Sequence, residues 1–148
     1  RMLASGFPFD ACQLPLNGLD ANFRSFQIRV LPELVRRGIA PIGMKSFGGE
    51  ANMLKKKVVT PDEALRYAMS LPVAGTISGI DSRRVLRQNL EIARDFQPMS
   101  PVEMDALRLR VAAEAADGRF ELYKVSAKHE GPVGRKQHGF PDDEEMAA

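Results

Sequence analysis

Two stretches of the sequence have the residue types and spacing that phosphate binding requires. Gly48 and Gly49 closely follow an apolar run, and paired glycines let backbone amides approach a phosphate. Lys45 adds a positive charge just before them. Ser82–Arg84 opens a helical pattern, and a helix N-terminus binds phosphate through free amides and its dipole. These stretches indicate phosphate contact, although the first also fits an ordinary strand-to-helix turn and the second a solvated helix face.

Other reactive residues are not arranged as sites. Cys12 lies in the middle of an apolar run, which predicts a buried, inert thiol. His129 and His138 are far apart and have no neighbouring ligand residues, so the sequence predicts no metal site. Lys55–Lys57 is typical of a solvated loop rather than a nucleic-acid surface, and the acidic run Asp142–Glu145 of a solubilising tail.

Composition places the chain among ordinary globular domains. Its 148 residues are 44% hydrophobic and 27% charged, which suits one domain with a real core. The net charge of +2 is too small to indicate a nucleic-acid or membrane partner, and no apolar run approaches the ~20 residues of a membrane span. A single cysteine excludes an internal disulfide, and no signal segment opens the chain. These features predict a cytoplasmic protein.

Apolar runs alternate with helical patterns, which predicts an α/β protein with parallel strands. A predicted helix over 21–37 is kinked by Pro32 and ended by Gly38, and two capping boxes, Thr60–Glu63 and Ser100–Glu103, begin later helices. The predicted strands cover 9–14, 39–44 and 73–79, and the later helices 60–71, 82–96 and 100–115.

The domain is expected to span 1–125, with an irregular or disordered tail over 126–148. Each predicted strand is apolar on both faces, as strands covered on both sides are. Three such strands alone would leave sheet edges and one apolar face unpartnered. The sequence therefore predicts either a homodimer or a further portion of a larger sheet as partner.

Several motifs, in this order and spacing, resemble the aldo-keto reductases. They match the sixth to eighth strands of that family's (β/α)8 barrel, the following helices and an extra C-terminal helix. The fold expected from the resemblance is a partial (β/α)8, or TIM-type, barrel of three β-α units. The motifs are FDACQ at 9–13, VLP at 30–32, GI at 38–39, GMKSFGG at 43–49, SGIDS at 78–82 and QN at 88–89.

The resemblance also implies a cofactor, NADP or NAD. It places Gln13 beside the nicotinamide, the loop from Met44 to Gly49 at the pyrophosphate and the segment 78–89 at the adenosine. Gln13 also fits a plain structural role as a buried glutamine bonded to the barrel wall. The implied cofactor-binding residues are Gln13, Met44, Lys45, Ser46, Gly48, Gly49, Asp81, Ser82, Arg83, Gln88 and Asn89.

This chain departs from the family pattern in ways that affect the cofactor. Met44 stands where the family commonly has an aromatic residue, and Val85 where NADP-preferring members often carry an arginine. Arg83 and Arg84 are close enough to substitute, whereas Asp81 would repel a 2′-phosphate. The preference between NADP and NAD stays open.

The family's catalytic aspartate, tyrosine, lysine and histidine lie on its first four strands, which this chain lacks. Tyr67, expected to be a half-buried helix residue, and Tyr123 lie in other segments and do not inherit the role. The first hypothesis is therefore the cofactor-binding part of an NAD(P)-dependent carbonyl reductase, which acts on a small carbonyl substrate only with the missing strands. The alternative is a non-catalytic partial-barrel binding protein, stand-alone and homodimeric. A third is another enzyme class with new residues at the strand ends, such as Asp20, Lys45, Glu50 or Asp81.

Overall fold

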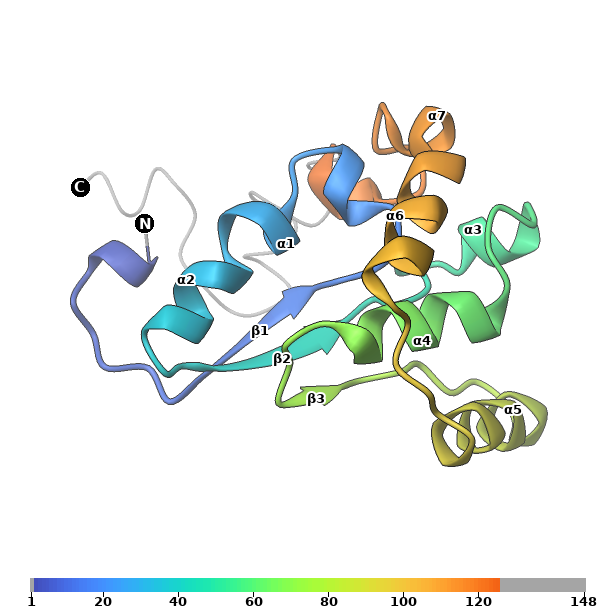
Figure 1. Cartoon of the computed structure of the whole chain (residues 1–148), viewed down its shortest axis with the longest axis horizontal. Coiled ribbons are helices and arrows are strands. Elements are labelled where there is room, and N and C mark those ends of the chain that lie inside the picture. Colours follow the sequence, from blue (N-terminus) through green and yellow to red (C-terminus); the bar gives the residue numbers. More distant parts are fainter. Residues whose placement is uncertain (1, 126–148) are drawn as a thin grey trace, which may run out of the picture.

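The computed structural model describes residues 2–125, and the predicted tail with His129, His138 and the acidic run lies outside them. Three parallel strands form one sheet in the order β1-β2-β3 (Figure 1). The strands are β1 (Ala11–Pro15), β2 (Ala40–Met44) and β3 (Gly75–Thr76). Helices separate them along the chain, which confirms the α/β class and the parallel sheet.

Seven α-helices and three short 3-10 helices occupy the described residues. The α-helices are α1 (Phe26–Arg29), α2 (Leu31–Arg36), α3 (Asn52–Lys55), α4 (Pro61–Ser70), α5 (Arg83–Arg94), α6 (Pro101–Arg110) and α7 (Ala112–Ala115). The 3-10 helices are η1 (Met2–Ala4), η2 (Asp20–Asn22) and η3 (Leu122–Lys124). Both predicted capping boxes are present, at the start of α4 and of α6.

The single kinked helix predicted over 21–37 is wrong. Arg24 has a φ of +42°, and the chain begins a new helix after it, where Ser25 caps α1 by accepting a hydrogen bond from the Ile28 amide. The Asp20 carboxylate accepts from the amides of Phe26 and Gln27, so this turn is held by side chains rather than by a continuous helix. Pro32 lies in the first turn of α2, where its missing amide costs nothing.

The third strand is also shorter than predicted. Only Gly75 and Thr76 pair with β2, opposite Ile42 and Gly43. Gly75 and Gly79 disfavour extended structure at a sheet edge, because a glycine has no side chain to pack there. The segment 77–82 instead runs as a loop into α5.

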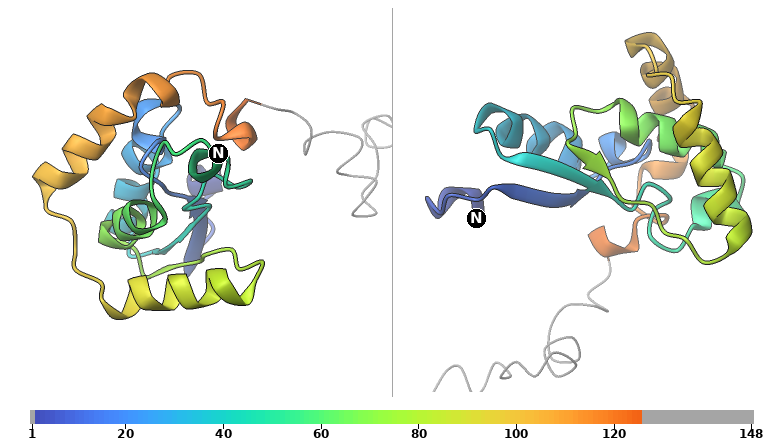
Figure 2. Two further views of the ribbon diagram at one scale, coloured as in Figure 1. Left: turned by 90° about the vertical axis from the view of Figure 1, so that its right-hand side faces the viewer. Right: turned by 90° about the horizontal axis from the view of Figure 1, so that it is seen from below.

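The sheet is covered on one face. The sheet register places Leu14 opposite Gly43, and both are buried on the side where the helices pack. Ala11 and Gln13 on the other side are exposed, and Ile42 is half-buried. α2 packs against β2 and α4 against β3, and Figure 2 shows both helices on the same side of the strands. This exposed second face agrees with the prediction that three strands alone leave one face of the sheet unpartnered.

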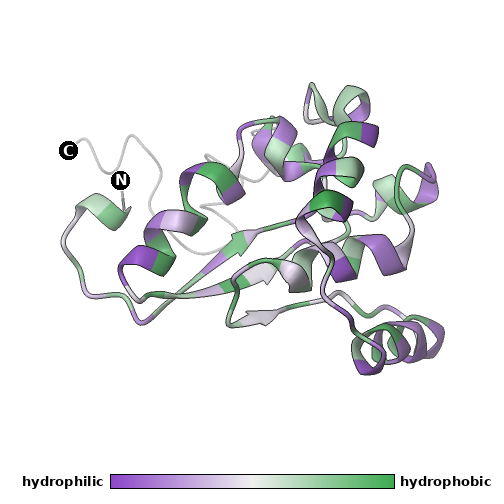
Figure 3. Ribbon diagram, in the orientation of Figure 1, coloured by the Kyte–Doolittle hydropathy of each residue, from purple (hydrophilic) through white to green (hydrophobic). Residues whose placement is uncertain are grey.

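The core lies between this face and the helices. It includes Leu16, Leu19 and Leu34, which are fully buried, and Leu107 and Val111 of the C-terminal helices. α5, in contrast, is mainly hydrophilic (Figure 3). No helix among residues 2–125 is long and apolar enough to cross a membrane.

Two burial predictions need correction. Cys12 is half-buried rather than buried, because β1 is an edge strand with neighbours on one side only. Tyr67 is fully buried rather than half-buried, and its hydroxyl donates to Gln27 Oε1 at 2.8 Å. A helix position could be predicted for Tyr67, but not the polar partner that allows its hydroxyl to be buried.

Candidate functional site

A groove of about 960 Å³ lies at the carboxyl ends of the three strands. Its walls come from the end of β1, the loop after β2, the loop after β3 with the start of α5, and the segment around η3. Ligands of open α/β sheets bind in such crevices, because successive loops meet at this edge. The groove is therefore the candidate functional site.

Eight of the residues predicted to bind a cofactor line this groove, although they are up to 75 positions apart in the sequence. They are Gln13, Met44, Lys45, Ser46, Gly48, Gly49, Asp81 and Gln88. Three predicted residues, Ser82, Arg83 and Asn89, are not among the lining residues.

Two of these three residues make structural hydrogen bonds, and the third is exposed. Ser82 is the N-cap of α5, and its hydroxyl accepts from the Val85 amide at 3.2 Å. Arg83 is exposed, and the neighbouring Arg84 lines the groove in its place. Asn89 is buried and donates to Ser78 Oγ at 2.9 Å, which ties the loop after β3 to α5.

The loop after β2 has an unusual backbone. Gly48 and Gly49 have φ values of +73° and +90°, in the region that glycine adopts without strain. Lys45 and Ala51, which flank the loop, have φ values of +54° and +55°, where a side chain is disfavoured. Such backbone conformations persist only when their surroundings hold them, and they are frequent at binding sites.

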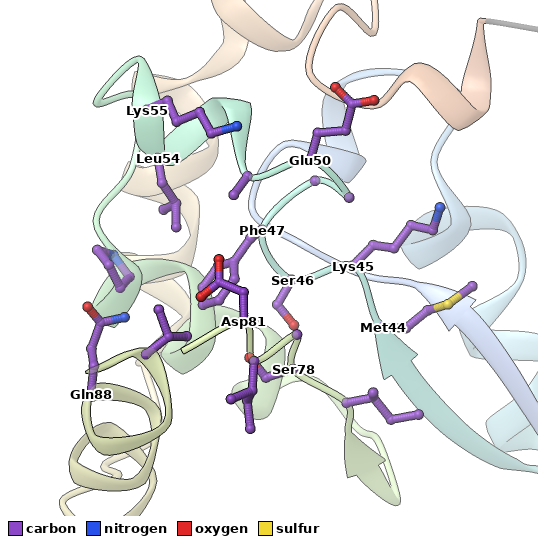
Figure 4. A pocket seen from close by; sticks show the side chains of 18 of the residues that line it. Met44, Lys45, Ser46, Phe47, Glu50, Leu54, Lys55, Ser78, Asp81 and Gln88 are labelled. Atoms are coloured by element: carbon purple, nitrogen blue, oxygen red, sulfur yellow. The ribbon is translucent and has the colours of Figure 1, made fainter. Parts of the chain in front are cut away.

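Ser46 is the most informative side chain of this loop. It is 2% exposed, it lines the groove, and its hydroxyl has no hydrogen-bond partner among the described residues. Buried hydroxyls are almost always bonded, so one without a partner needs an explanation. Figure 4 shows Ser46 directed toward the side of the groove where Ser78 and Asp81 lie.

Lys45 extends to the opposite side of the loop (Figure 4). Its ammonium lies 4.5 Å from the centre of the Tyr123 ring, a cation–π contact, and no described carboxylate lies within 4.0 Å of it. Its positive charge is thus held at the groove without being neutralised by an ion pair.

Gln13 and Met44 lie side by side at the ends of β1 and β2. The Gln13 amide donates to the Met44 sulfur at 3.2 Å, and sulfur is a weak acceptor. Gln13 is exposed rather than buried, and this bond to the end of β2 is its only side-chain hydrogen bond among residues 2–125. Its amide is available to a stronger partner.

Tyr123 is a wall residue that was not predicted from the sequence. Its hydroxyl donates to Glu121 Oε1 at 2.6 Å and accepts from Asn17 Nδ2 at 3.2 Å. Burial, and then the charge of Glu121, raise the pKa of Tyr123 far above its usual value. The only available signal was Glu121 and Lys124 flanking an aromatic residue after the helical pattern ends.

Comparisons with known proteins identify no relative. No family model matches the chain. No curated protein and no solved structure matches it either. The aldo-keto reductase resemblance stays a prediction made from the motifs. Residues 2–125 also contain no cluster of three or more histidine, cysteine, aspartate or glutamate side chains able to hold a metal ion.

Proposed function

We propose that the groove binds a nicotinamide dinucleotide, NADP or NAD, and that the chain is the cofactor-binding part of an aldo-keto-reductase-like (β/α)8 barrel. The observation that carries the proposal is the meeting of eight predicted residues, from three separate segments, in one groove at the carboxyl edge of a parallel sheet. Its volume of about 960 Å³ is at the upper end of the usual range for small-molecule sites, as a dinucleotide requires.

The centre of the groove fits a pyrophosphate. The unpartnered Ser46 hydroxyl can donate to a phosphate oxygen, and the Gly48–Gly49 backbone leaves room for close approach. Arg84 and the N-terminal end of α5 contribute positive charge from the opposite wall. These groups are those that a doubly charged anion requires.

The two ends of the groove differ in chemistry. Asp81 and Gln88 at the α5 end offer hydrogen-bond acceptors for ribose hydroxyls and a polar edge for adenine. At the other end Gln13 can exchange its weak sulfur partner for a carboxamide, and Met44 offers a polarisable surface. Arg84 favours a 2′-phosphate and Asp81 disfavours it, so both NADP and NAD are proposed.

When bound, the cofactor supplies a hydride for the reduction of a small carbonyl substrate. Neither of the two described tyrosines is placed to serve as the matching proton donor. The Tyr123 hydroxyl is bonded to Glu121, and its raised pKa makes it a poor acid. Tyr67 is fully buried away from the groove. We therefore propose that catalysis requires strands supplied by another portion of the barrel, while this chain binds the cofactor.

Titration with NADPH and NADH, followed by native mass spectrometry and by cofactor fluorescence, tests the proposal. One cofactor per chain is expected, and Lys45→Glu should weaken binding more than tenfold because it reverses the charge beside the loop. Lys56→Glu is the matched control, since Lys56 is exposed and does not line the groove. Binding that is undetectable for the wild type, or equal for both variants, would refute the proposal.

A second candidate is a non-catalytic binding protein that acts as a homodimer. The observation that favours it is the uncovered face of the sheet together with its two edge strands, β1 and β3. Parallel sheets are normally buried on both faces, and a second copy would provide that cover. Sedimentation equilibrium separates the candidates, because a monomer at micromolar concentration would exclude this one.

A further inference from the structure

The segment after α7 folds back onto the strand ends and is fixed there by tight packing. This segment, Asp117–Val125, is called the C-terminal turn below. Gly118 has a φ of +74°, and a Cβ at this position would lie 2.8 Å from the Phe23 ring and 2.9 Å from Val125. Only glycine fits such a position, so the turn is closely packed against the segment that follows η2.

A buried charge network anchors the C-terminal turn. The Lys124 ammonium donates to Asp20 Oδ1 at 2.7 Å, to Glu121 Oε2 at 2.8 Å and to the Phe23 carbonyl at 2.7 Å. The three charged side chains are 2% exposed or less. Asp20 is fixed in turn by the amides at the start of α1, as described above. The network joins the turn to the first β-α connection.

Glu121 connects this buried network to Tyr123. Its second oxygen, Oε1, accepts from the Tyr123 hydroxyl at 2.6 Å and from Asn17 Nδ2 at 2.9 Å. Asn17 Oδ1 accepts from the amides of Leu19 and Asp20, so the Asn17 side chain is itself oriented. Tyr123 is consequently held from its hydroxyl end, and its ring forms the groove wall.

This turn and Asn17, which donates a hydrogen bond to the Tyr123 hydroxyl, touch the loop after β2 at three points. The Lys45 ammonium lies over the Tyr123 ring, and the Lys45 carbonyl accepts from Asn17 Nδ2 at 3.4 Å. A Cβ on Gly48 would lie only 2.7 Å from the Phe120 carbonyl oxygen, so the loop packs directly on the turn. Each contact involves a loop residue that lines the groove.

We infer that the C-terminal turn is a positioning element of the groove, in which the Tyr123 ring directs the Lys45 ammonium to an anionic ligand. Glu121 and Lys124 act through Tyr123 and touch no ligand themselves. The effect on binding rests on the proposed dinucleotide site, whereas the placement of Lys45 by the ring does not. Two measurements separate these parts.

The first measurement needs no ligand. The side-chain methylene protons of Lys45 are assigned by NMR with a Lys45→Arg variant, and their ring-current shift is recorded. Because the ammonium lies 4.5 Å from the ring centre, upfield shifts are expected in the wild type, and smaller ones in Tyr123→Phe, which keeps the ring but loses the hydroxyl that holds it. Tyr123→Leu should abolish them. Ordinary lysine shifts in the wild type would overturn the inference, even if Tyr123→Leu does not fold.

The second measurement is a double-mutant cycle with NADPH and inorganic pyrophosphate as probes. Tyr123→Leu is expected to weaken binding about tenfold, and Tyr123→Phe, which keeps the ring but loses the hydroxyl bonded to Glu121, by an intermediate amount. In a Lys45→Met background the Leu substitution should cause no further loss, because the two residues act as one unit. Additive losses would indicate a merely structural tyrosine and overturn the inference.

A wild type that binds neither probe would refute the proposed function instead. The inference would then be decided by the NMR shifts alone. Retained shifts would support the placement of Lys45 by Tyr123, and absent shifts would overturn it.

Discussion

Replacing Lys124 by methionine tests how much the buried network stabilises the fold. The substitution keeps most of the side-chain volume and removes the ammonium from between Asp20 and Glu121, which are 0% and 1% exposed. Two buried carboxylates then face each other without a counter-charge. Removing one partner of a buried ion pair typically costs about 3–5 kcal/mol.

The remaining hydrogen bonds place the expected loss at the low end of that range. Asp20 keeps the Ser25 hydroxyl and the amides of Phe26 and Gln27, and Glu121 keeps Asn17 and Tyr123. We expect Lys124→Met to lower the free energy of unfolding by about 3 kcal/mol. In a chain of this size that lowers the melting temperature by roughly 10 °C.

Urea denaturation and calorimetry provide the assay. A second substitution, Glu121→Gln, should recover part of the stability by removing one of the two charges. Lys56→Met, at an exposed position, is the matched control and should have no measurable effect.

Two results would contradict this reasoning. A loss equal to that of Lys56→Met would show that the ammonium does not compensate the carboxylates. A second substitution, Glu121→Gln, that recovers no stability would show that the loss comes from packing rather than from charge.

Two further predictions concern the tyrosines and the glycine loop. Burial is the main factor that raises the pKa of both tyrosines, Tyr67 and Tyr123, so no phenolate absorbance should appear near pH 10 before the protein unfolds. Tyrosines of the unfolded chain ionise near pH 10, so this contribution to the free energy of unfolding is fully present below pH 10. Above pH 10 the free energy of unfolding falls by about 1.4 kcal/mol per pH unit for each tyrosine. A normal tyrosine titration of the native protein would disprove this. Gly48→Ala should destabilise the fold by about 3 kcal/mol in urea denaturation, because the new Cβ meets the Phe120 carbonyl at 2.7 Å. Gly38→Ala, which also has a positive φ but an open surrounding, should cost only about 1 kcal/mol, and equal losses would show that the contact with Phe120 is unimportant.

Local signals predicted much of the fold. The capping boxes at Thr60 and Ser100 correctly located the starts of α4 and α6, because a cap is a contact between residues three apart. The helix over 21–37 failed for the opposite reason. Its apolar spacing is helical, but the break at Arg24 depends on the side chains of Asp20 and Ser25, which accept from the amides of residues 26–28 in place of helix carbonyls.

In the candidate site, too, local features could be predicted from the sequence and long-range contacts could not. The glycine pair is a sequence-local feature, so it indicated the loop from Met44 to Gly49, whereas the meeting of this loop with Asp81 and Gln88 was expected only from the resemblance. The contribution of Tyr123 depends on contacts across more than 70 residues, with Asn17 and Lys45. The spacing of apolar residues along the sequence does not indicate such contacts. The short η3 helix that contains Tyr123 also has no capping side chain that could have predicted it.

The buried network is better explained by the geometry it imposes than by its stability. A well-packed apolar cluster of similar size would stabilise the turn as well or better, since burying three charges costs desolvation. Apolar contacts, however, permit small shifts, whereas each oxygen of Glu121 has its own donor in a fixed direction. The nearby helices α6 and α7 pack through apolar residues such as Leu107 and Val111, away from the groove. The directional contacts are thus used where a single position of Tyr123, and with it of the Lys45 charge, matters for the groove.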